Sequence, residues 1–135
     1  RLEQIVEGGL KHITAGRYCK VKVDPISLRV WVLAPERDEL VETTQLSTGT
    51  RDLIYLVLRM GITQLMSKSG EKLPLLLDDP LVEYDEIRQK AALEYLMSLS
   101  AETQILLFTK DGDVKDWFGG SGLANSDQHR LIELR

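Results

Sequence analysis

The sequence predicts one α/β lobe in which an antiparallel hairpin or meander precedes a parallel βαβ core. Polar and apolar residues alternate between 17 and 33, a pattern typical of paired, half-buried strands. Two short apolar runs, at 73–77 and 104–108, flank a segment with helical periodicity, and this order is typical of parallel strands joined by a crossover helix. The length of 135 residues suits one compact domain.

The first third of the chain predicts a helix followed by short strands. Residues 1–15 carry apolar side chains at spacings of three to five, and Gly16 is placed to end the helix. Residues 17–23 and 28–33 predict two strands joined by an Asp-Pro turn, and 40–43 predicts a short third strand.

The rest of the chain predicts two helices and two buried strands. Residues 53–66 are apolar on nearly every side, as in a buried helix, and 85–99 predicts the crossover helix. The continuous apolar runs at 73–77 and 104–108 are typical of strands buried on both faces. The glycine-rich stretch 111–128 predicts a loop with at most one helical turn, and 131–134 predicts an edge strand.

The composition argues against several classes of protein. A net charge of −4 weighs against a stand-alone nucleic-acid binder, which usually carries a basic face. The single cysteine, Cys19, excludes an internal disulfide and fits the reducing cytoplasm. No apolar run is long enough to span a bilayer, so we expect no membrane partner and a cytoplasmic location. Because the chain begins at Arg1 and not at Met, we expect it to be part of a longer protein.

Two acids follow the first predicted parallel strand. Asp78 and Asp79 stand at its carboxyl end, where α/β sheets place their ligands. Adjacent carboxylates there need a cation, and Mg²⁺ held by a carboxylate and phosphate oxygens is the usual solution at phosphoryl-transfer sites. The alternative is an Asp-Asp-Pro turn with two solvated carboxylates, and the residues alone leave both interpretations open.

A small polar motif precedes the buried helix. Ser47 and Thr48 offer hydroxyl groups, Gly49 allows close approach of the backbone, and helix N-termini attract phosphate. The alternative is an ordinary helix cap formed by Ser47 or Thr50.

The order of these motifs resembles the C-terminal half of an ABC-type ATPase head of the SMC, RecF and RecN kind, and most closely the YhaN-like coiled-coil ATPases. The resemblance covers about residues 10–110 and rests on Ser47-Thr48-Gly49, the long apolar helix, and the strand that ends in Asp78-Asp79. It implies the C-terminal lobe of a P-loop fold.

The resemblance implies a role for each motif residue. Ser47, Thr48 and Gly49 correspond to the signature motif, which contacts the ATP γ-phosphate across a dimer interface, and Asp85 corresponds to the D-loop aspartate. Mg²⁺ and ATP are the implied cofactors, and a second ATPase head is the implied partner in a homodimer.

The same resemblance places the hydrolytic residues. Asp78 corresponds to the Walker B aspartate that holds Mg²⁺, and Asp79 corresponds to the catalytic acid. Lys110 stands where the family has its switch histidine, and a lysine lacks the neutral hydrogen bonding of imidazole. The chain contains no G-x-x-x-x-G-K-[ST] sequence, so the phosphate cradle has to come from an N-terminal Walker A lobe.

The implied organisation has four parts. Residues 1–15 end a connecting or coiled-coil helix, 16–45 form antiparallel strands, 46–110 carry the signature helix, Walker B strand, D-loop and switch strand, and 111–135 form a loop and an edge strand. The implied function is ATP hydrolysis that opens and closes paired heads, with DNA as a further partner in repair, recombination or chromosome maintenance.

Two other functions stay open from the sequence. One is a non-catalytic docking or dimerisation module with a degenerate ATPase-head fold, which Lys110 at the switch position favours. The other is a Mg²⁺-dependent phosphohydrolase that uses Asp78 and Asp79 directly, with Glu83 and Asp85 as the nearest further acids.

Overall fold

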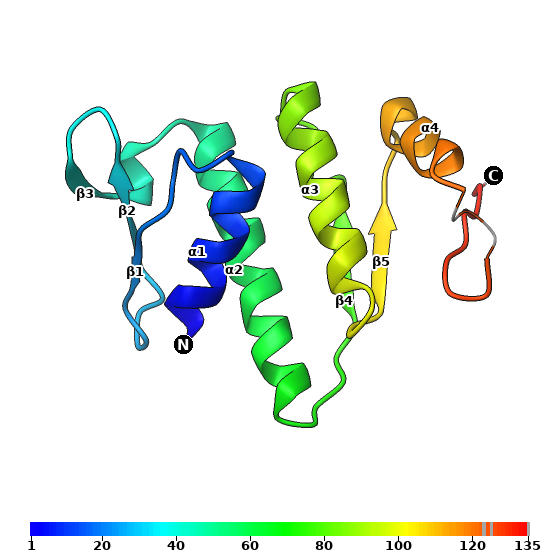
Figure 1. Ribbon diagram of the computed structural model, residues 1–135, viewed down its shortest axis with the longest axis horizontal. Coiled ribbons are helices and arrows are strands. Elements are labelled where there is room, and N and C mark those ends of the chain that lie inside the picture. Colours follow the sequence, from blue (N-terminus) through cyan, green and yellow to red (C-terminus); the bar gives the residue numbers. More distant parts are fainter. Residues whose placement is uncertain (123, 125, 135) are drawn as a thin grey trace.

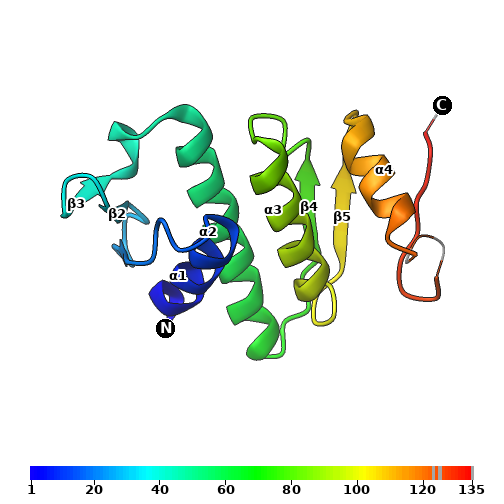
Figure 2. The same cartoon turned by 45° about the horizontal axis from the view of Figure 1, so that its top comes forward.

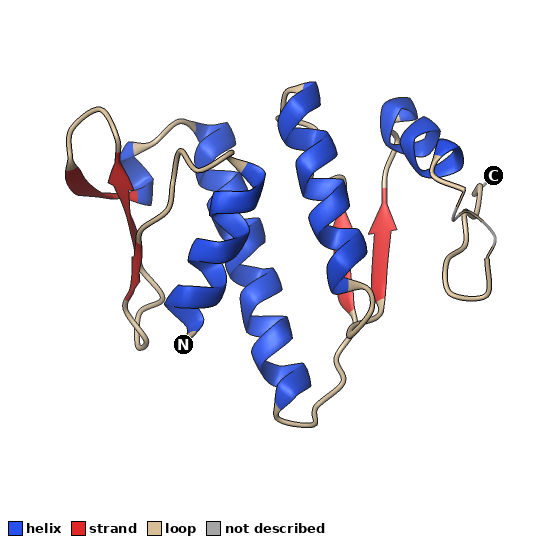
Figure 3. Ribbon diagram, viewed as in Figure 1, coloured by secondary structure: helices blue, strands red, loops and turns tan. Residues whose placement is uncertain are grey.

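The computed structural model describes residues 1–122, 124 and 126–134, and it has a mixed α/β architecture with two separate sheets. A meander lies at one end, the long helices lie in the middle, and a parallel strand pair lies beyond them (Figures 1 and 3). The elements in chain order are α1 (Leu2–Ile13), β1 (Val21–Val23), β2 (Val30–Ala34), β3 (Glu39–Glu42), the 3-10 turn η1 (Thr43–Gln45), α2 (Thr48–Lys68), β4 (Leu75–Asp78), α3 (Glu86–Leu99), β5 (Ile105–Phe108) and α4 (Gly112–Gly120).

The three N-terminal strands form the predicted antiparallel meander. Strand β1 pairs with β2 and β2 pairs with β3, with Val32 opposite both Val21 and Val41. These three valines are buried, since alternate residues of each strand face the helices. The prediction for this part of the chain is confirmed, with β1 and β2 shorter than the sequence pattern suggested.

Helix α1 covers the outer edge of the meander. The carboxylates of Glu7 and Glu3 accept hydrogen bonds from the backbone N–H groups of Val21 and Val23, at 3.0 and 2.8 Å. These N–H groups would otherwise be open to pairing with another strand. The two glutamates therefore close this edge of the sheet.

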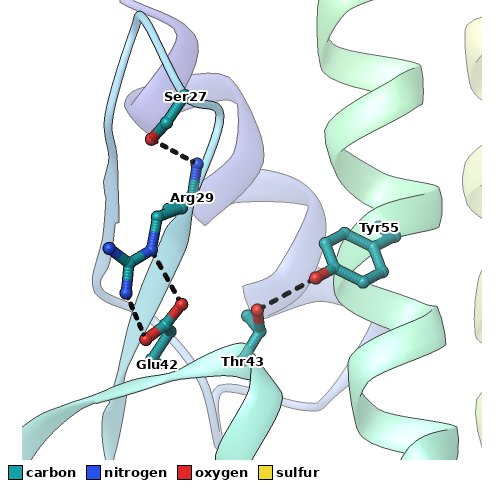
Figure 4. A network of polar contacts seen from close by, with 5 residues as sticks. All are labelled: Ser27, Arg29, Glu42, Thr43 and Tyr55. Carbon is teal, nitrogen blue, oxygen red and sulfur yellow. Dashed lines mark hydrogen bonds and ion pairs between the residues drawn. The ribbon is translucent and has the colours of Figure 1, made fainter.

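Polar contacts stabilise the meander near the end of β3 (Figure 4). The Arg29 guanidinium donates two hydrogen bonds to the Glu42 carboxylate, at 2.9 and 2.7 Å, and these bonds hold the pKa of Glu42 below its ordinary value. The hydroxyl groups of the buried Thr43 and of Tyr55 on α2 lie 3.3 Å apart. The start of α2 is thereby tied to the end of β3.

A glycine allows three helices to approach closely. A Cβ atom at Gly9 would lie 2.7 Å from Cγ1 of Val57 on α2 and 3.2 Å from the ring of Tyr95 on α3. The side-chain hydrogen of glycine leaves room for both neighbours, and α1 contacts α2 and α3 here. The apolar residues of both parts of the chain then form one continuous core cluster.

The C-terminal part contains the predicted βαβ unit. Strand β4 pairs in parallel with β5, Leu75 opposite Ile105, and α3 connects the two strands and lies beside them (Figure 2). The apolar runs were expected to be buried on both faces, and this expectation is wrong. Leu77 is fully buried, whereas Leu76 is 50% and Phe108 45% exposed, because among the described residues this sheet has two strands and helices cover only one of its faces.

Three further boundaries differ from the sequence expectations. Helix α2 begins at Thr48 and not at residue 53, because Ser47 caps it. Residues 112–120 form helix α4 and not a loop, because the Asp111 carboxylate caps that segment. Residues 131–134 were expected to form an edge strand, and the structure assigns them none. None of the described helices is long and apolar enough to cross a bilayer.

Candidate functional site

The candidate site lies where β4 and β5 end. Asp78 is the last residue of β4 and pairs in register with Phe108, the last residue of β5. The chain then turns sharply at Asp79, whose φ is 44°, and the Asp79 N–H donates to the Phe108 carbonyl at 2.7 Å. The two loops that leave the parallel strands therefore meet at this acid pair.

The two carboxylates have different surroundings. Asp78 is exposed and follows the exposed Leu76 by two residues, which puts it on the uncovered face of the sheet. Asp79 is half-buried and its Oδ1 accepts two hydrogen bonds, from the Thr109 hydroxyl at 2.7 Å and from the Lys110 N–H at 3.2 Å. Asp78 is thus open to solvent, and Asp79 is held by the loop that follows β5.

Asp78 has the properties of a Mg²⁺ ligand that needs further donors. Mg²⁺ is usually bound by one or two carboxylates together with waters and substrate phosphates. Within the described part of the chain, no three or more His, Cys, Asp or Glu side chains form a cluster that could hold a metal. The residues present fit Mg²⁺ delivered with a phosphate and do not form an all-protein cage.

The signature-like motif lies at the start of α2. Ser47 caps the helix, since its Oγ accepts a hydrogen bond from the Thr50 N–H at 3.3 Å and its hydroxyl donates to Thr50 Oγ1 at 2.9 Å. Ser47 and Thr48 are exposed. A Cβ atom at Gly49 would lie 3.5 Å from the Glu83 carbonyl, an ordinary contact, so the motif adjoins the loop that follows the acid pair.

Asp85 and Lys110 lie at the rim of the site. Asp85 caps α3, because its carboxylate accepts a hydrogen bond from the Arg88 N–H at 2.8 Å. Its carboxylate also lies 3.7 Å from the Arg88 guanidinium. Lys110 is exposed, and its backbone N–H contacts the acid pair through the hydrogen bond to Asp79. The structure thus gathers the predicted residues around the loops after β4 and β5 and the start of α2.

A small groove separates α2 from the loop after β4. It has a volume of about 240 Å³, and Asp52, Arg59, Asp79 and Glu83 contribute to its lining. Arg59 donates a hydrogen bond to the Leu76 carbonyl on β4 at 2.9 Å, which anchors α2 to the strand that carries the acids. Sequence patterns gave no indication of this role for Arg59.

Tyr84 belongs to the same loop, and its ring packs against the core. Its hydroxyl is buried and has no hydrogen-bond partner among the described residues. Burial raises the pKa of Tyr84 well above its ordinary value, and the nearby Asp52 carboxylate raises it further. The ring therefore stays neutral and fixes the loop by packing.

A larger open cleft runs along β5 on the side away from β4. Its volume is about 810 Å³, and it lies between α3, β5, α4 and the C-terminal segment. The residues that line the cleft include Asp78, Asp79, Leu96, Phe108, Lys110 and Trp117. The acid pair thus opens onto a cleft beside a strand edge that pairs with no further strand among the described residues.

Sequence reasoning missed three residues that support the site. Thr109 bonds to Asp79, Asp111 caps α4, and the buried Gln89 of α3 donates to the Asp111 carboxylate at 2.8 Å. An aspartate one residue ahead of a glycine and two ahead of a second acid is a helix-start signal that identifies Asp111. No local pattern points to Gln89 or Thr109.

Comparison with known proteins gives an informative similarity. The chain is 38% identical over 93 residues to the uncharacterized protein YhaN of Bacillus subtilis (strain 168). The matched stretch covers 67% of this chain and 9% of YhaN, so the chain corresponds to a small part of a much longer relative. No family model matches the chain.

Proposed function

We propose that the chain is the C-terminal lobe of an ABC-type ATPase head of the SMC, RecF and RecN kind. The observation that carries this proposal is the position of Asp78 and Asp79 at the carboxyl end of β4, next to the end of the parallel strand β5 and close to the start of α2. Ligands of α/β sheets bind at such ends, and helix N-termini favour phosphate. The similarity to part of YhaN supports a lobe within a longer protein.

The open side of the parallel sheet supports an upstream lobe. The β5 edge has no strand partner among the described residues, and the cleft beside it is about 810 Å³. The uncovered sheet face exposes Leu76, Leu106 and Phe108 by 40 to 50%. Apolar side chains on a parallel sheet are normally covered on both faces. An N-terminal lobe with the Walker A sequence would fill the cleft and cover this face.

The side chains have distinct tasks in this proposal. Asp78 holds Mg²⁺, which when bound with ATP neutralises charge on the phosphates. Asp79 orients the attacking water and accepts its proton. Ser47, Thr48 and Gly49 face the nucleotide of a second head, and Asp85 lies on the loop between the acid pair and α3. Hydrolysis then separates the two heads, and DNA is the proposed substrate of that movement.

A docking module without catalysis is the second candidate. Lys110 favours it, because an ammonium group can contact a phosphate but cannot replace the hydrogen bonding of a neutral imidazole. A self-contained phosphohydrolase has less support, since the described residues hold no cluster of three metal-ligating side chains and the Asp85 carboxylate caps α3.

The chain by itself is expected not to bind Mg-ATP with micromolar affinity. The backbone donors and the lysine of a Walker A loop are absent from its sequence, and they supply most contacts to the phosphates. Isothermal calorimetry of the chain with Mg-ATP measures this. Micromolar binding would mean that the nucleotide site lies elsewhere than proposed.

Ser47→Arg in the complete protein is expected to spare ATP binding and to abolish ATP-dependent dimerisation of heads. Ser47 is exposed at the start of α2, so the arginine can be accommodated by this chain while its bulk and charge meet the second head. Light scattering with and without ATP measures the dimer fraction. Ser69→Arg, at the exposed other end of α2, is the matched control. Dimerisation of Ser47→Arg at wild-type levels would exclude this surface as the head interface.

A further inference from the structure

A chain of hydrogen bonds runs from the interior of the fold to the acid pair. The Thr109 hydroxyl donates to Asp79 Oδ1 at 2.7 Å, and the Asp111 N–H donates to Thr109 Oγ1 at 3.0 Å. The Thr109 hydroxyl thus accepts one hydrogen bond, from Asp111, and donates its own proton to Asp79. Hydrogen bonds linked in this way strengthen one another.

The inner end of this chain is a buried amide. Gln89 on α3 is 9% exposed, and its Nε2 donates to Asp111 Oδ2 at 2.8 Å. The other oxygen of Asp111 accepts the Asp113 N–H at 2.9 Å, which starts α4. Both oxygens of Asp111 are therefore engaged, and a buried polar side chain fixes the place of the loop.

The outer end constrains one oxygen of Asp79 only. Oδ1 accepts the hydrogen bonds of both the Thr109 hydroxyl and the Lys110 N–H, while no donor to Oδ2 is found in the part of the chain that the structure describes. The left-handed backbone at Asp79, with φ of 44°, costs free energy for a residue other than glycine. The bonds from the loop after β5 offset this cost and hold the carboxylate in one orientation.

We propose that Thr109 and Gln89 are positioning residues for Asp79. Thr109 sets the orientation of the carboxylate directly, and Gln89 sets the place of Thr109 through Asp111. The proposal rests on the proposed ATPase function, since it assigns these residues to the water-activating step of that site. The alternative role for the same bonds is a cap for α4 with no effect on Asp79.

The first experiment separates orientation from binding in the complete protein. Thr109→Val keeps the shape of the side chain and removes the donor, and it should lower kcat about tenfold with unchanged nucleotide affinity, since a displaced catalytic group loses rate and not binding. Thr109→Ser should restore kcat, because it restores the hydroxyl. A role limited to capping α4 predicts unchanged kcat in both variants and would overturn the proposal.

The second experiment uses this chain alone and needs no activity. Amide hydrogen exchange measured by NMR reports on the Lys110 N–H, which donates a hydrogen bond to Asp79 Oδ1. Thr109→Val and Gln89→Met should each accelerate exchange at Lys110 about tenfold, whereas Lys90→Met, at an exposed position of the same helix, should not. Exchange at Lys110 that is equal in all variants would refute the link itself.

The two experiments distinguish the failure of this inference from the failure of the proposed function. Normal kcat in Thr109→Val together with loss of hydrolysis in Asp79→Asn overturns the positioning role and leaves the ATPase assignment standing. Accelerated exchange in Thr109→Val together with normal hydrolysis in Asp79→Asn means that the hydrogen bonds exist and that Asp79 is not catalytic. That result overturns the ATPase role of Asp79 and the positioning role with it.

Discussion

Asp79→Asn in the complete protein is expected to lower ATP hydrolysis by roughly two orders of magnitude or more, the scale of a lost general base. The amide oxygen of asparagine can still accept the hydrogen bonds that Thr109 and the Lys110 N–H donate to Oδ1. The NH₂ group then takes the place of Oδ2, so the geometry is kept and the basic oxygen is lost. Nucleotide binding should change little, and ATP-bound dimers should accumulate.

Asp78→Asn is the informative comparison for that experiment. Asp78 is exposed on the open face of the sheet and is the candidate ligand of Mg²⁺. Its loss should weaken Mg-ATP binding itself, whereas Asp79→Asn should leave binding intact. Steady-state ATPase rates, nucleotide affinity and dimer fraction measured on both variants separate the two roles. Wild-type turnover in Asp79→Asn would exclude a catalytic role and favour the docking module.

The parallel strand pair was predictable because its signal is local. Each strand is a short apolar run followed by polar residues, and the helical segment between them has the length of a crossover. The sequence alone also placed Asp78 and Asp79 at the end of this strand. The local pattern could not predict which residues contact the two acids. Asp79 and Thr109 are 30 residues apart in the sequence, and the register of β4 and β5 brings them together.

The burial of this sheet was not predictable from the chain alone. Leu76, Leu106 and Phe108 are apolar, and composition therefore assigned them to an interior. They are 40 to 50% exposed here because no helix covers their face among the described residues. An apolar run indicates that a strand is covered on both faces, and the covering residues can belong to another part of a longer protein. The mismatch therefore agrees with the proposal that an upstream lobe covers this face.

Helix α4 was missed for a different reason. Its segment contains Gly112, Gly119 and Gly120, and glycine lowers helix propensity. The cap at Asp111 and the packing of Val114 into the core offset that cost. The sequence also suggested Ser47 as a helix cap, and the structure confirms this cap. A cap and a nucleotide contact do not exclude each other, because Ser47 remains an exposed residue at the start of α2.

Leu77→Ala is expected to destabilise this chain by about 2–5 kcal/mol, a large part of the stability of a typical domain. Leu77 is fully buried in the core, so the truncation removes packing contacts and leaves a cavity next to the acid pair. Urea denaturation of the chain, followed by circular dichroism, measures the free energy of unfolding.

Leu76→Ala is the matched control, because Leu76 is the preceding residue of the same strand and is 50% exposed on the opposite face. In the chain alone it should cost about 1 kcal/mol or less, since half of its surface is already in water. In the complete protein the cost should rise, because the proposed upstream lobe would bury Leu76. Equal losses for Leu76→Ala and Leu77→Ala in the chain alone would contradict the one-sided burial of β4. An equally small loss for Leu76→Ala in the complete protein would mean that no upstream lobe covers this face of the sheet.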